Sequence, residues 1–181
     1  MRDAAGFTLV EVLVALLVLG AGMVGGMAMQ LHAMRTRHES ALLSASTQLA
    51  VAMADRMRAN AGQVTAIYLG VDYDAHAAPV PAAPDDPCRL YPCDPARIAR
   101  LDIHELERQV RATLPAGRAR ICRDAQMYVG GQLRWECSGG PDDPIVVKIG
   151  WRGRHPDGTP RRDGGRGAVP GVAIVVAGVR P

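Results

Sequence analysis

Apolar residues are concentrated near the N-terminus of this chain. Between residues 7 and 29, 17 of 23 positions belong to the hydrophobic class, and Glu11 is the only charged side chain among them. At 1.5 Å per residue this stretch forms a helix about 34 Å long, enough to cross the hydrocarbon of a bilayer. The pattern predicts a membrane-spanning helix over residues 7–29.

Beyond this stretch, apolar residues recur mostly at spacings of three, four or seven, the period of a helix with one buried face. They are Leu31, Met34, Leu42, Ala45, Leu49, Met53 and Met57. Gly62 is the expected end of the helix. We therefore expect residues 30–62 to form an amphipathic half of the same long helix, packed against the chain's own globular domain.

Prolines interrupt the pattern over residues 63–101, where six of the 13 prolines fall. A regular helix does not tolerate that density, so an irregular loop is expected there. A second helix is expected from Asp102 to Leu114. Asp102 and Glu105 are spaced as in a capping box, and apolar residues follow at helical spacing.

After Gly117 the hydrophobic period changes to the alternation of strands. The candidate strands are Arg118–Arg123, Met127–Val129, Gln132–Cys137, Ile145–Trp151 and Val169–Val179. Gly130 and Gly131 separate the second from the third, as in a two-residue hairpin turn. The expected fold is α+β, a long N-terminal helix packed against an antiparallel sheet. Residues 102–181 form the globular domain together with residues 30–62.

Composition narrows the classes of function. The 181 residues are 48% hydrophobic and 22% charged, which fits one ordinary domain plus the N-terminal segment. The net charge is +3, and Lys148 is the only lysine among 21 basic residues. Basicity by itself therefore does not indicate a nucleic-acid partner. The most basic segment, residues 151–167, is interpreted as a solvated loop, since Asp157 and Asp163 dilute its arginines.

The sequence contains no catalytic or cofactor-binding motif. It lacks a nucleophile elbow, a phosphate loop, a dinucleotide fingerprint and an HExxH pair. His104 has no His or Cys companion at helical spacing. We therefore expect no enzymatic activity, no cofactor and no bound metal.

The four cysteines favour disulfide bonds if the domain lies outside the cytoplasm, and three pairings are possible. We favour Cys88 with Cys93, which closes a tight loop, and Cys122 with Cys137, on the two sides of the hairpin. The hairpin register places Asp124 opposite Cys137, so the second pair requires a bulge or a different turn. The spacing of the cysteines argues against a four-cysteine zinc site.

Glu11 is the anomaly of the apolar segment, because a carboxylate inside an apolar helix costs about 2–3 kcal/mol. A secretory signal peptide would have a basic start, a shorter apolar run and a small-residue cleavage site. Gly26-Met27-Ala28 imitates such a site, but the run is long enough to remain as an anchor. The segment is therefore interpreted as a retained helix.

Residues 6–17, Gly-Phe-Thr-Leu-Val-Glu-Val-Leu-Val-Ala-Leu-Leu, resemble the class III signal of type IV pilins and pseudopilins. That signal has a short leader ending in Gly, then Phe, then Glu as the fifth residue from that Phe. The resemblance implies a leader of residues 1–6, cleavage between Gly6 and Phe7 by a prepilin peptidase, and N-methylation of Phe7. It also implies a single-pass inner-membrane protein with a periplasmic domain that later enters the pilus.

The resemblance also implies a role for Glu11 in assembly. One helical turn, about 6 Å, separates it from Phe7, so the terminal amine of a shifted neighbouring subunit can meet the carboxylate and fix the register. Residues 53–60, Met-Ala-Asp-Arg-Met-Arg-Ala-Asn, are similar to a segment of PilV-type minor pilins. The implied partners are the prepilin peptidase, the other minor pilins, the major pilin and the assembly platform.

Three other functions remain open. A minor pseudopilin of a type II secretion system carries the same signal. A membrane-anchored, adhesin-like binding module or an exported enzyme keeps the sheet domain but does not need Glu11. The mature N-terminus separates the pilin class from these last alternatives.

Overall fold

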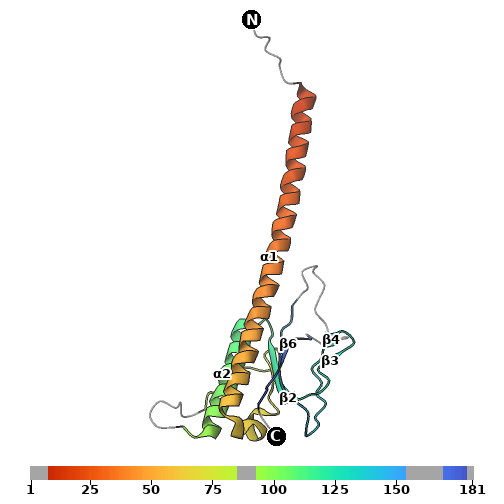
Figure 1. Cartoon of the computed structure of the whole chain (residues 1–181). Coiled ribbons are helices and arrows are strands. Elements are labelled where there is room, and N and C mark those ends of the chain that lie inside the picture. The colour runs from red at the N-terminus through yellow and green to blue at the C-terminus, as the bar shows by residue number, and fades with distance from the viewer. Residues whose placement is uncertain (1–7, 85–92, 154–168, 179–181) are drawn as a thin grey trace. The chain divides into compact units, whose positions relative to one another are not determined.

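The computed structural model describes residues 8–84, 93–153 and 169–178 of the chain. The chain divides into two compact units, Met1–His38 and Glu39–Pro181. Helix α1 (Leu9–Ala59) contributes to both of them (Figure 1). Its two parts therefore have different surroundings and are considered separately.

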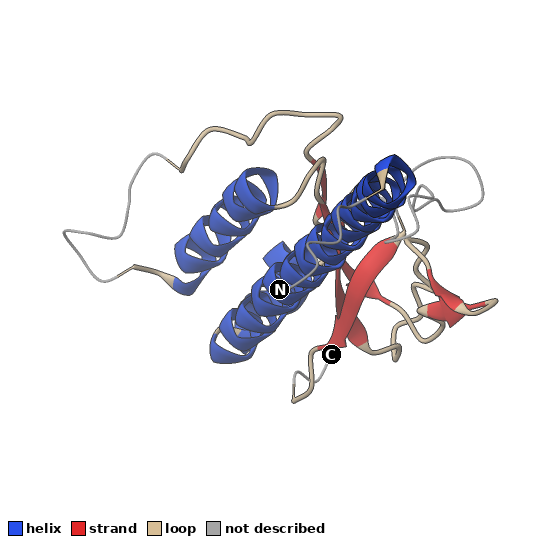
Figure 2. Cartoon of the chain, turned by 90° about the horizontal axis from the view of Figure 1, so that it is seen from above, coloured by secondary structure: helices blue, strands red, loops and turns tan. Residues whose placement is uncertain are grey.

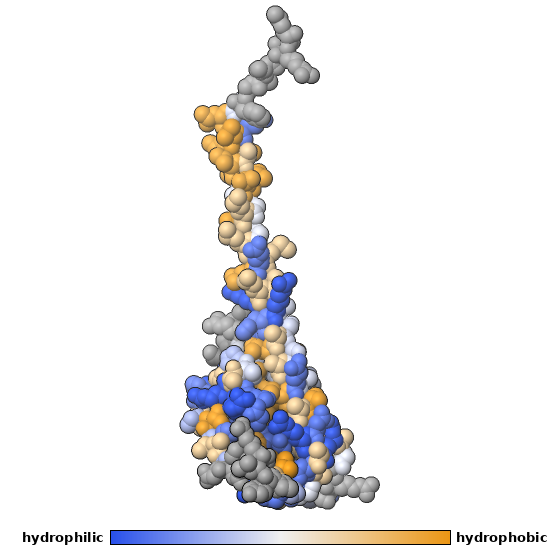
Figure 3. Space-filling model, turned by 90° about the vertical axis from the view of Figure 1, so that its left-hand side faces the viewer, coloured by the Kyte–Doolittle hydropathy of each residue, from blue (hydrophilic) through white to orange (hydrophobic). Residues whose placement is uncertain are grey.

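The first part of α1 is apolar and uncovered. An 18-residue window of the helix has a mean hydropathy of 2.3, and none of that window is buried. Figure 3 shows hydrophobic side chains gathered over the first turns of the helix. By length and composition alone, this helix is able to cross a membrane. It contains the predicted membrane segment apart from Phe7, which lies outside the described residues, and Thr8, which precedes the helix.

A side-chain cap explains where α1 begins. The Thr8 hydroxyl accepts a hydrogen bond from the backbone N–H of Glu11 at 3.3 Å. Thr8 followed by Glu11 three residues later has the spacing of a capping box, and an acidic residue in the first turn is favoured by the helix dipole. The local sequence thus specifies the helix start and places Glu11 in its first turn.

The second unit is built on a four-stranded antiparallel sheet. Its strands, in spatial order, are β1 (Asp72–Asp74), β2 (Arg118–Arg123), β5 (Ile145–Gly150) and β6 (Pro170–Val175). Figure 2 shows the second part of α1 and helix α2 (Pro95–Thr113) on one side of the sheet. A short hairpin of β3 (Tyr128–Val129) and β4 (Gln132–Leu133) lies on the other side (Figure 2). The predicted α+β fold, with the helix packed against an antiparallel sheet, is confirmed.

One hydrophobic core fills the space between the helices and the sheet. The second part of α1 buries Leu42, Ala50, Met53, Ala54 and Met57, and α2 buries Ala99, Leu106 and Val110. The sheet contributes Ala119, Ile121, Ile145, Val147 and Ile149, followed by Trp151. Each large side chain buried in this way contributes about 1.5–3 kcal/mol. The predicted apolar stripe of the long helix therefore packs against the chain's own domain from Leu42 onward. The expectation was wrong for Leu31 and Met34, which are 51% and 69% exposed and belong to the N-terminal unit.

Helix α1 ends at Ala59, close to the predicted stop at Gly62, and two short helical segments of different periods follow it. A 3-10 turn, η1 (Ala61–Gln63), is followed by a π-helical segment, η2 (Val64–Tyr68). Val64 and Tyr68 are fully buried, so tertiary packing holds these turns where the local sequence predicts a break. The expectation of an irregular loop over residues 63–101 is corrected for this part and for strand β1.

Helix α2 begins seven residues before the predicted start at Asp102. The Asp94 carboxylate accepts a hydrogen bond from the backbone N–H of Arg97 at 3.0 Å, and Pro95 occupies the first helical position. Pro is favoured there because its missing N–H is not needed in the first turn. Because residues 63–101 contain six prolines, a loop was expected where α2 begins. Asp102 lies in the middle of the helix rather than at its N-cap.

The strand predictions hold best for β2 and β5, which pair with each other in the middle of the main sheet. Strand β2 has the predicted bounds, and β5 ends one residue earlier than expected. In the hairpin, Gly130 and Gly131 both have positive φ, 60° and 83°, as a two-residue turn with both central residues at positive φ requires. Strand β4 ends at Leu133 rather than at Cys137, because the chain leaves the hairpin there and crosses the outer face of the sheet.

Candidate functional site

The N-terminal unit presents Glu11 on an apolar surface. Glu11 is exposed, and so are its apolar neighbours; Leu13 and Leu16 are 59% and 64% exposed. Exposed apolar surface of this extent marks a site that contacts a membrane or another protein. Within the described residues no ion pair joins Glu11 to the chain itself. Gly6 and Phe7, the predicted cleavage and methylation site, lie outside the described residues.

Four glycines follow in the same part of α1: Gly20, Gly22, Gly25 and Gly26. A Cβ added at any of them would meet no described heavy atom within 4 Å. Each glycine costs up to about 1 kcal/mol relative to alanine in a helix interior. No contact made by the described chain requires their small size, whereas close packing of helices in a membrane does.

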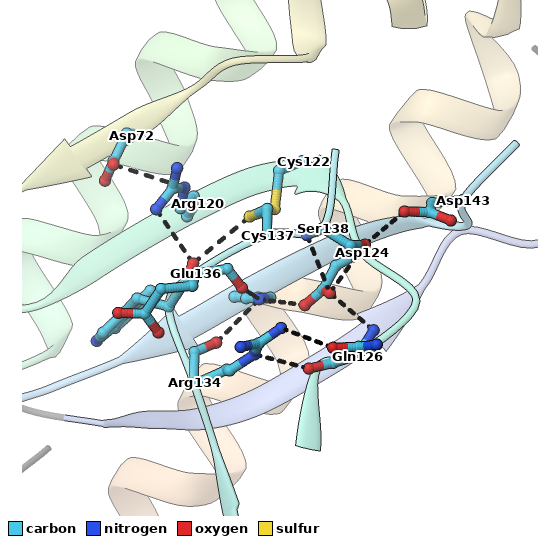
Figure 4. The surroundings of a disulfide bond; sticks show 12 residues. Asp72, Arg120, Cys122, Asp124, Gln126, Arg134, Glu136, Cys137, Ser138 and Asp143 are labelled. Atoms are coloured by element: carbon cyan, nitrogen blue, oxygen red, sulfur yellow. Dashed lines mark hydrogen bonds and ion pairs between the residues drawn. A yellow bond between two sulfur atoms is a disulfide. The ribbon is translucent and has the colours of Figure 1, made fainter. Parts of the chain in front are cut away.

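The Cys122–Cys137 disulfide ties strand β2 to the segment that crosses the outer face of the sheet (Figure 4). The two Cα atoms are 6.3 Å apart. This is the pairing expected from the sequence. Of the other expected pair, Cys88 lies outside the described residues, while Cys93 is disulfide-bonded.

Lys148 occupies the centre of this outer face. It lies on β5, is 0% exposed, and donates to three acceptors. They are the Asp124 carboxylate at 2.5 Å, the Glu136 carbonyl at 2.7 Å and the Arg134 carbonyl at 2.9 Å. An ammonium group has three N–H donors, so all of them are used. A buried charge is tolerated only with such complete pairing.

Asp124 is the counter-ion of Lys148 and is also 0% exposed. Its other oxygen accepts hydrogen bonds from the backbone N–H groups of Gln126, at 2.8 Å, and Ser138, at 3.4 Å. Burial raises the pKa of the Asp124 carboxyl, but the hydrogen bonds from Lys148 and from these N–H groups outweigh it and hold the pKa below its ordinary value. The Asp124 carboxyl is therefore ionised at neutral pH.

Sequence reasoning missed this buried pair. Lys148 stands between Val147 and Ile149 in a strand, and alternation assigns a lysine in that position to the solvent side. One signal was present, namely a single lysine in a chain that otherwise uses arginine for its basic residues. A compact ammonium suits three converging acceptors, which the planar guanidinium fork of arginine does not match.

Residues near the end of α1 form a second polar cluster, which joins α1 to α2. The Asp102 carboxylate accepts from the Tyr68 hydroxyl at 2.6 Å and from Arg56 at 3.1 Å. The Asn60 amide donates to the carbonyl of Pro95 at 2.7 Å and to the Tyr68 oxygen at 3.4 Å. Burial, followed by the hydrogen bond to Asp102, raises the pKa of the Tyr68 hydroxyl.

This cluster gives a structural role to several residues of the segment 53–60. Met53, Ala54 and Met57 are buried in the core, while Arg56 and Asn60 make the polar contacts to α2. The segment therefore holds the long helix to the globular domain. Within the described part of the chain, no group of three or more His, Cys, Asp or Glu side chains is placed to hold a metal ion.

Residues 1–27 match the family model of the prokaryotic N-terminal methylation motif. No curated protein and no solved structure matches the chain. The motif covers the predicted cleavage junction, Glu11 and most of the apolar segment, and it does not extend to the sheet domain. The motif and the helix that carries it support a type IV pilin-like or pseudopilin-like protein, processed by a prepilin peptidase and anchored by its N-terminal helix.

Proposed function

We propose that this chain is a minor subunit of a type IV pilus that takes part in pilus assembly as a structural component. The observation that carries the proposal is the methylation motif over residues 1–27, placed on a helix whose apolar side chains are uncovered. Such a helix has two suitable environments, the bilayer before assembly and a bundle of like helices afterwards.

In this proposal the prepilin peptidase cuts between Gly6 and Phe7 and the new Phe7 amine is methylated. Residues 1–6 are the leader, residues 7–29 the helix of the membrane and filament core, and the remainder the periplasmic domain. The Glu11 carboxylate then accepts the charged amine of a neighbouring subunit. Leaving a carboxylate unpaired in an apolar bundle is costly, so the pair selects one register between subunits.

The exposed position of Glu11 supports this role. It lies in the first turn of α1, where the helix dipole favours an acid, and its neighbours in the described chain are apolar side chains. The carboxylate is thus available to a second chain. The other implied partners are the remaining minor pilins, the major pilin and the assembly platform of the inner membrane.

The PilV type is the finer part of the proposal. It rests on the similarity of residues 53–60, several of which make the contacts that attach α1 to α2. A similar segment in another minor pilin would perform the same task, so the similarity supports a shared architecture of helix and globular domain.

Fractionation of the producing cell tests the proposal. The chain should be found in the inner membrane and, in smaller amount than the major subunit, in pili sheared from the cell surface. Its deletion should reduce the number of pili, and the intact gene should restore them. A chain that is absent from sheared pili, and whose deletion abolishes type II secretion but not piliation, would identify a pseudopilin instead.

A further inference from the structure

The segment between the two bonded cysteines is attached to the sheet in a second, non-covalent way. Residues 124–138 leave β2 after Arg123, turn through the β3–β4 hairpin, and return across the outer face of the sheet. Asp124 lies near the start of this segment, and Arg134 and Glu136 lie near its end. All three bond to the single ammonium of Lys148.

These acceptors are placed next to the cysteines. Asp124 follows Cys122 by two residues, and Glu136 immediately precedes Cys137. Asp124 also reaches across to the other end of the segment, where it accepts a hydrogen bond from the backbone N–H of Ser138. The buried polar group therefore holds the two ends of the segment, and with them the two sulfur atoms, on the same part of the sheet.

We infer that Lys148 is the positioning residue that directs Cys122 to pair with Cys137 during oxidative folding. The chain has four cysteines and hence three possible pairings. Formation of the sheet places Lys148 next to strand β2, opposite Arg120, and its three N–H groups gather the Asp124 carboxylate and the two carbonyls before oxidation. The two thiols are thereby held within bonding range, and pairing with Cys88 or Cys93 is disfavoured.

The redox step needs an oxidant, and a disulfide such as glutathione disulfide is sufficient. The thiolate of one cysteine attacks it and releases one glutathione thiol. The thiolate of the other cysteine then attacks the mixed disulfide and releases the second. Two protons and two electrons leave the protein, and one disulfide becomes two thiols. Lys148 takes no part in the electron transfer and affects only the proximity of the two sulfur atoms.

Lysine is the residue suited to this task because of its charge and shape. Its three donors meet three acceptors that belong to different parts of the segment. The other 20 basic residues of the chain are arginines. A planar guanidinium group is better suited to binding one carboxylate through two parallel hydrogen bonds than to binding three separate acceptors. The coupling between the disulfide and the hydrogen bonds of Lys148 is reciprocal. The disulfide stabilises these hydrogen bonds by the same free energy by which the hydrogen bonds stabilise the disulfide.

Refolding of the reduced full-length chain in detergent micelles tests the inference. The protein is oxidised in a mixture of reduced and oxidised glutathione, and its disulfides are mapped by proteolysis and mass spectrometry. For Lys148→Met, the equilibrium yield of Cys122–Cys137 against glutathione should fall about tenfold, the scale of a lost hydrogen bond to a charged group. Pairs that join Cys122 or Cys137 to Cys88 or Cys93 should increase.

Leu106→Ala is the matched control, because Leu106 lies on α2, on the opposite side of the sheet, and is 4% exposed. It should lower stability while leaving the native pairing at the wild-type level. Native pairing in Lys148→Met equal to that of the wild type would overturn the inference. So would an equal loss of native pairing in Leu106→Ala, since that result would assign the effect to stability alone.

A measurement on the unaltered chain covers the case in which Lys148→Met does not fold. Lys148 is the only lysine, so acylation of a lysine side chain occurs on a single peptide of the chain. The rate at which an amine-acylating reagent modifies that peptide, measured by mass spectrometry, reports the burial of Lys148. In the reduced, folded protein Lys148 should remain protected from acylation at least ten times longer than in denaturant. Acylation of Lys148 as soon as the disulfide is reduced would show that the disulfide holds the lysine in place, and would overturn the inference.

Discussion

The Tyr68 hydroxyl donates a hydrogen bond of 2.6 Å to the Asp102 carboxylate, and this contact joins the helical turns after α1 to the middle of α2. Tyr68 is fully buried, and Arg56 completes the charge balance of Asp102. The long helix is thus attached to the globular domain at its C-terminal end by polar contacts as well as by the core.

The first prediction concerns alkaline pH. The folded-state pKa of Tyr68 is raised, so its contribution to stability is fully present below the unfolded pKa of about 10 and is lost as pH rises through the higher folded value. Urea unfolding of the chain in micelles should show a free energy of unfolding that declines above about pH 10. Tyr68→Phe should lose about 1.5–3 kcal/mol at neutral pH and show a smaller alkaline decline. An unchanged alkaline decline in this variant would contradict the assignment.

The second prediction concerns acidic pH. The folded-state pKa of Asp124 is lowered, so its contribution is present above the unfolded pKa of about 3.9 and is lost as pH falls through the lower folded value. Asp124→Asn should cost about 3–5 kcal/mol at pH 7, since it leaves the buried Lys148 charge unpaired. The difference in unfolding free energy between wild type and variant should shrink below about pH 4. A difference that stays constant down to pH 2 would refute the ion pair as its source.

The third prediction tests the packing of α1 on the sheet. Ala50 is 0% exposed in the core, whereas Ala41 on the same helix is exposed. Ala50→Leu should lower the unfolding free energy by about 1–3 kcal/mol, because the added atoms overfill a packed interface. Ala41→Leu makes the same chemical change and should leave stability within about 0.5 kcal/mol of the wild type. Equal effects of the two substitutions would place the buried face of α1 elsewhere.

The fourth prediction concerns Glu11. Glu11→Gln keeps the shape of the side chain and removes its charge, so the variant should insert into the membrane and be processed as the wild type is. Its amount in sheared pili, measured by immunoblot, should fall about tenfold or more, because a neighbour's amine would lack its counter-ion. Val12→Ala, at the adjacent position, serves as the control and should assemble normally. Normal incorporation of Glu11→Gln would remove Glu11 from the assembly mechanism.

The sequence predicts the fold where local pattern and tertiary packing agree. The alternation of Ala119 and Ile121 with polar residues marks strand β2, and the Gly130-Gly131 pair marks the hairpin. Asp94 and Pro95 show where the two disagree. As part of a proline-rich stretch these two residues predict no helix. In the structure Asp94 is the N-cap of α2 and Pro95 is its first residue.

The buried polar group was beyond sequence reasoning for a different reason. Alternation assigns Lys148 to the outer face of the sheet, and it does lie there. Alternation does not show that residues 124–138 return over that face and bury the Lys148 side chain. The same return ends β4 early and brings Cys137 to Cys122, which the ideal hairpin register does not do. The disulfide was predicted because Cys122 and Cys137 lie on the two sides of the Gly130-Gly131 turn, and the structure contains it.

The mature N-terminus tests the central claim most directly. Mass spectrometry of the chain purified from the inner membrane or from sheared pili should show that residues 1–6 are removed and that Phe7 carries an N-methyl group. The unmodified precursor should accumulate when the prepilin peptidase is absent. A mature chain that begins near Met29, as after signal peptidase cleavage, or one that retains Met1, would contradict the account.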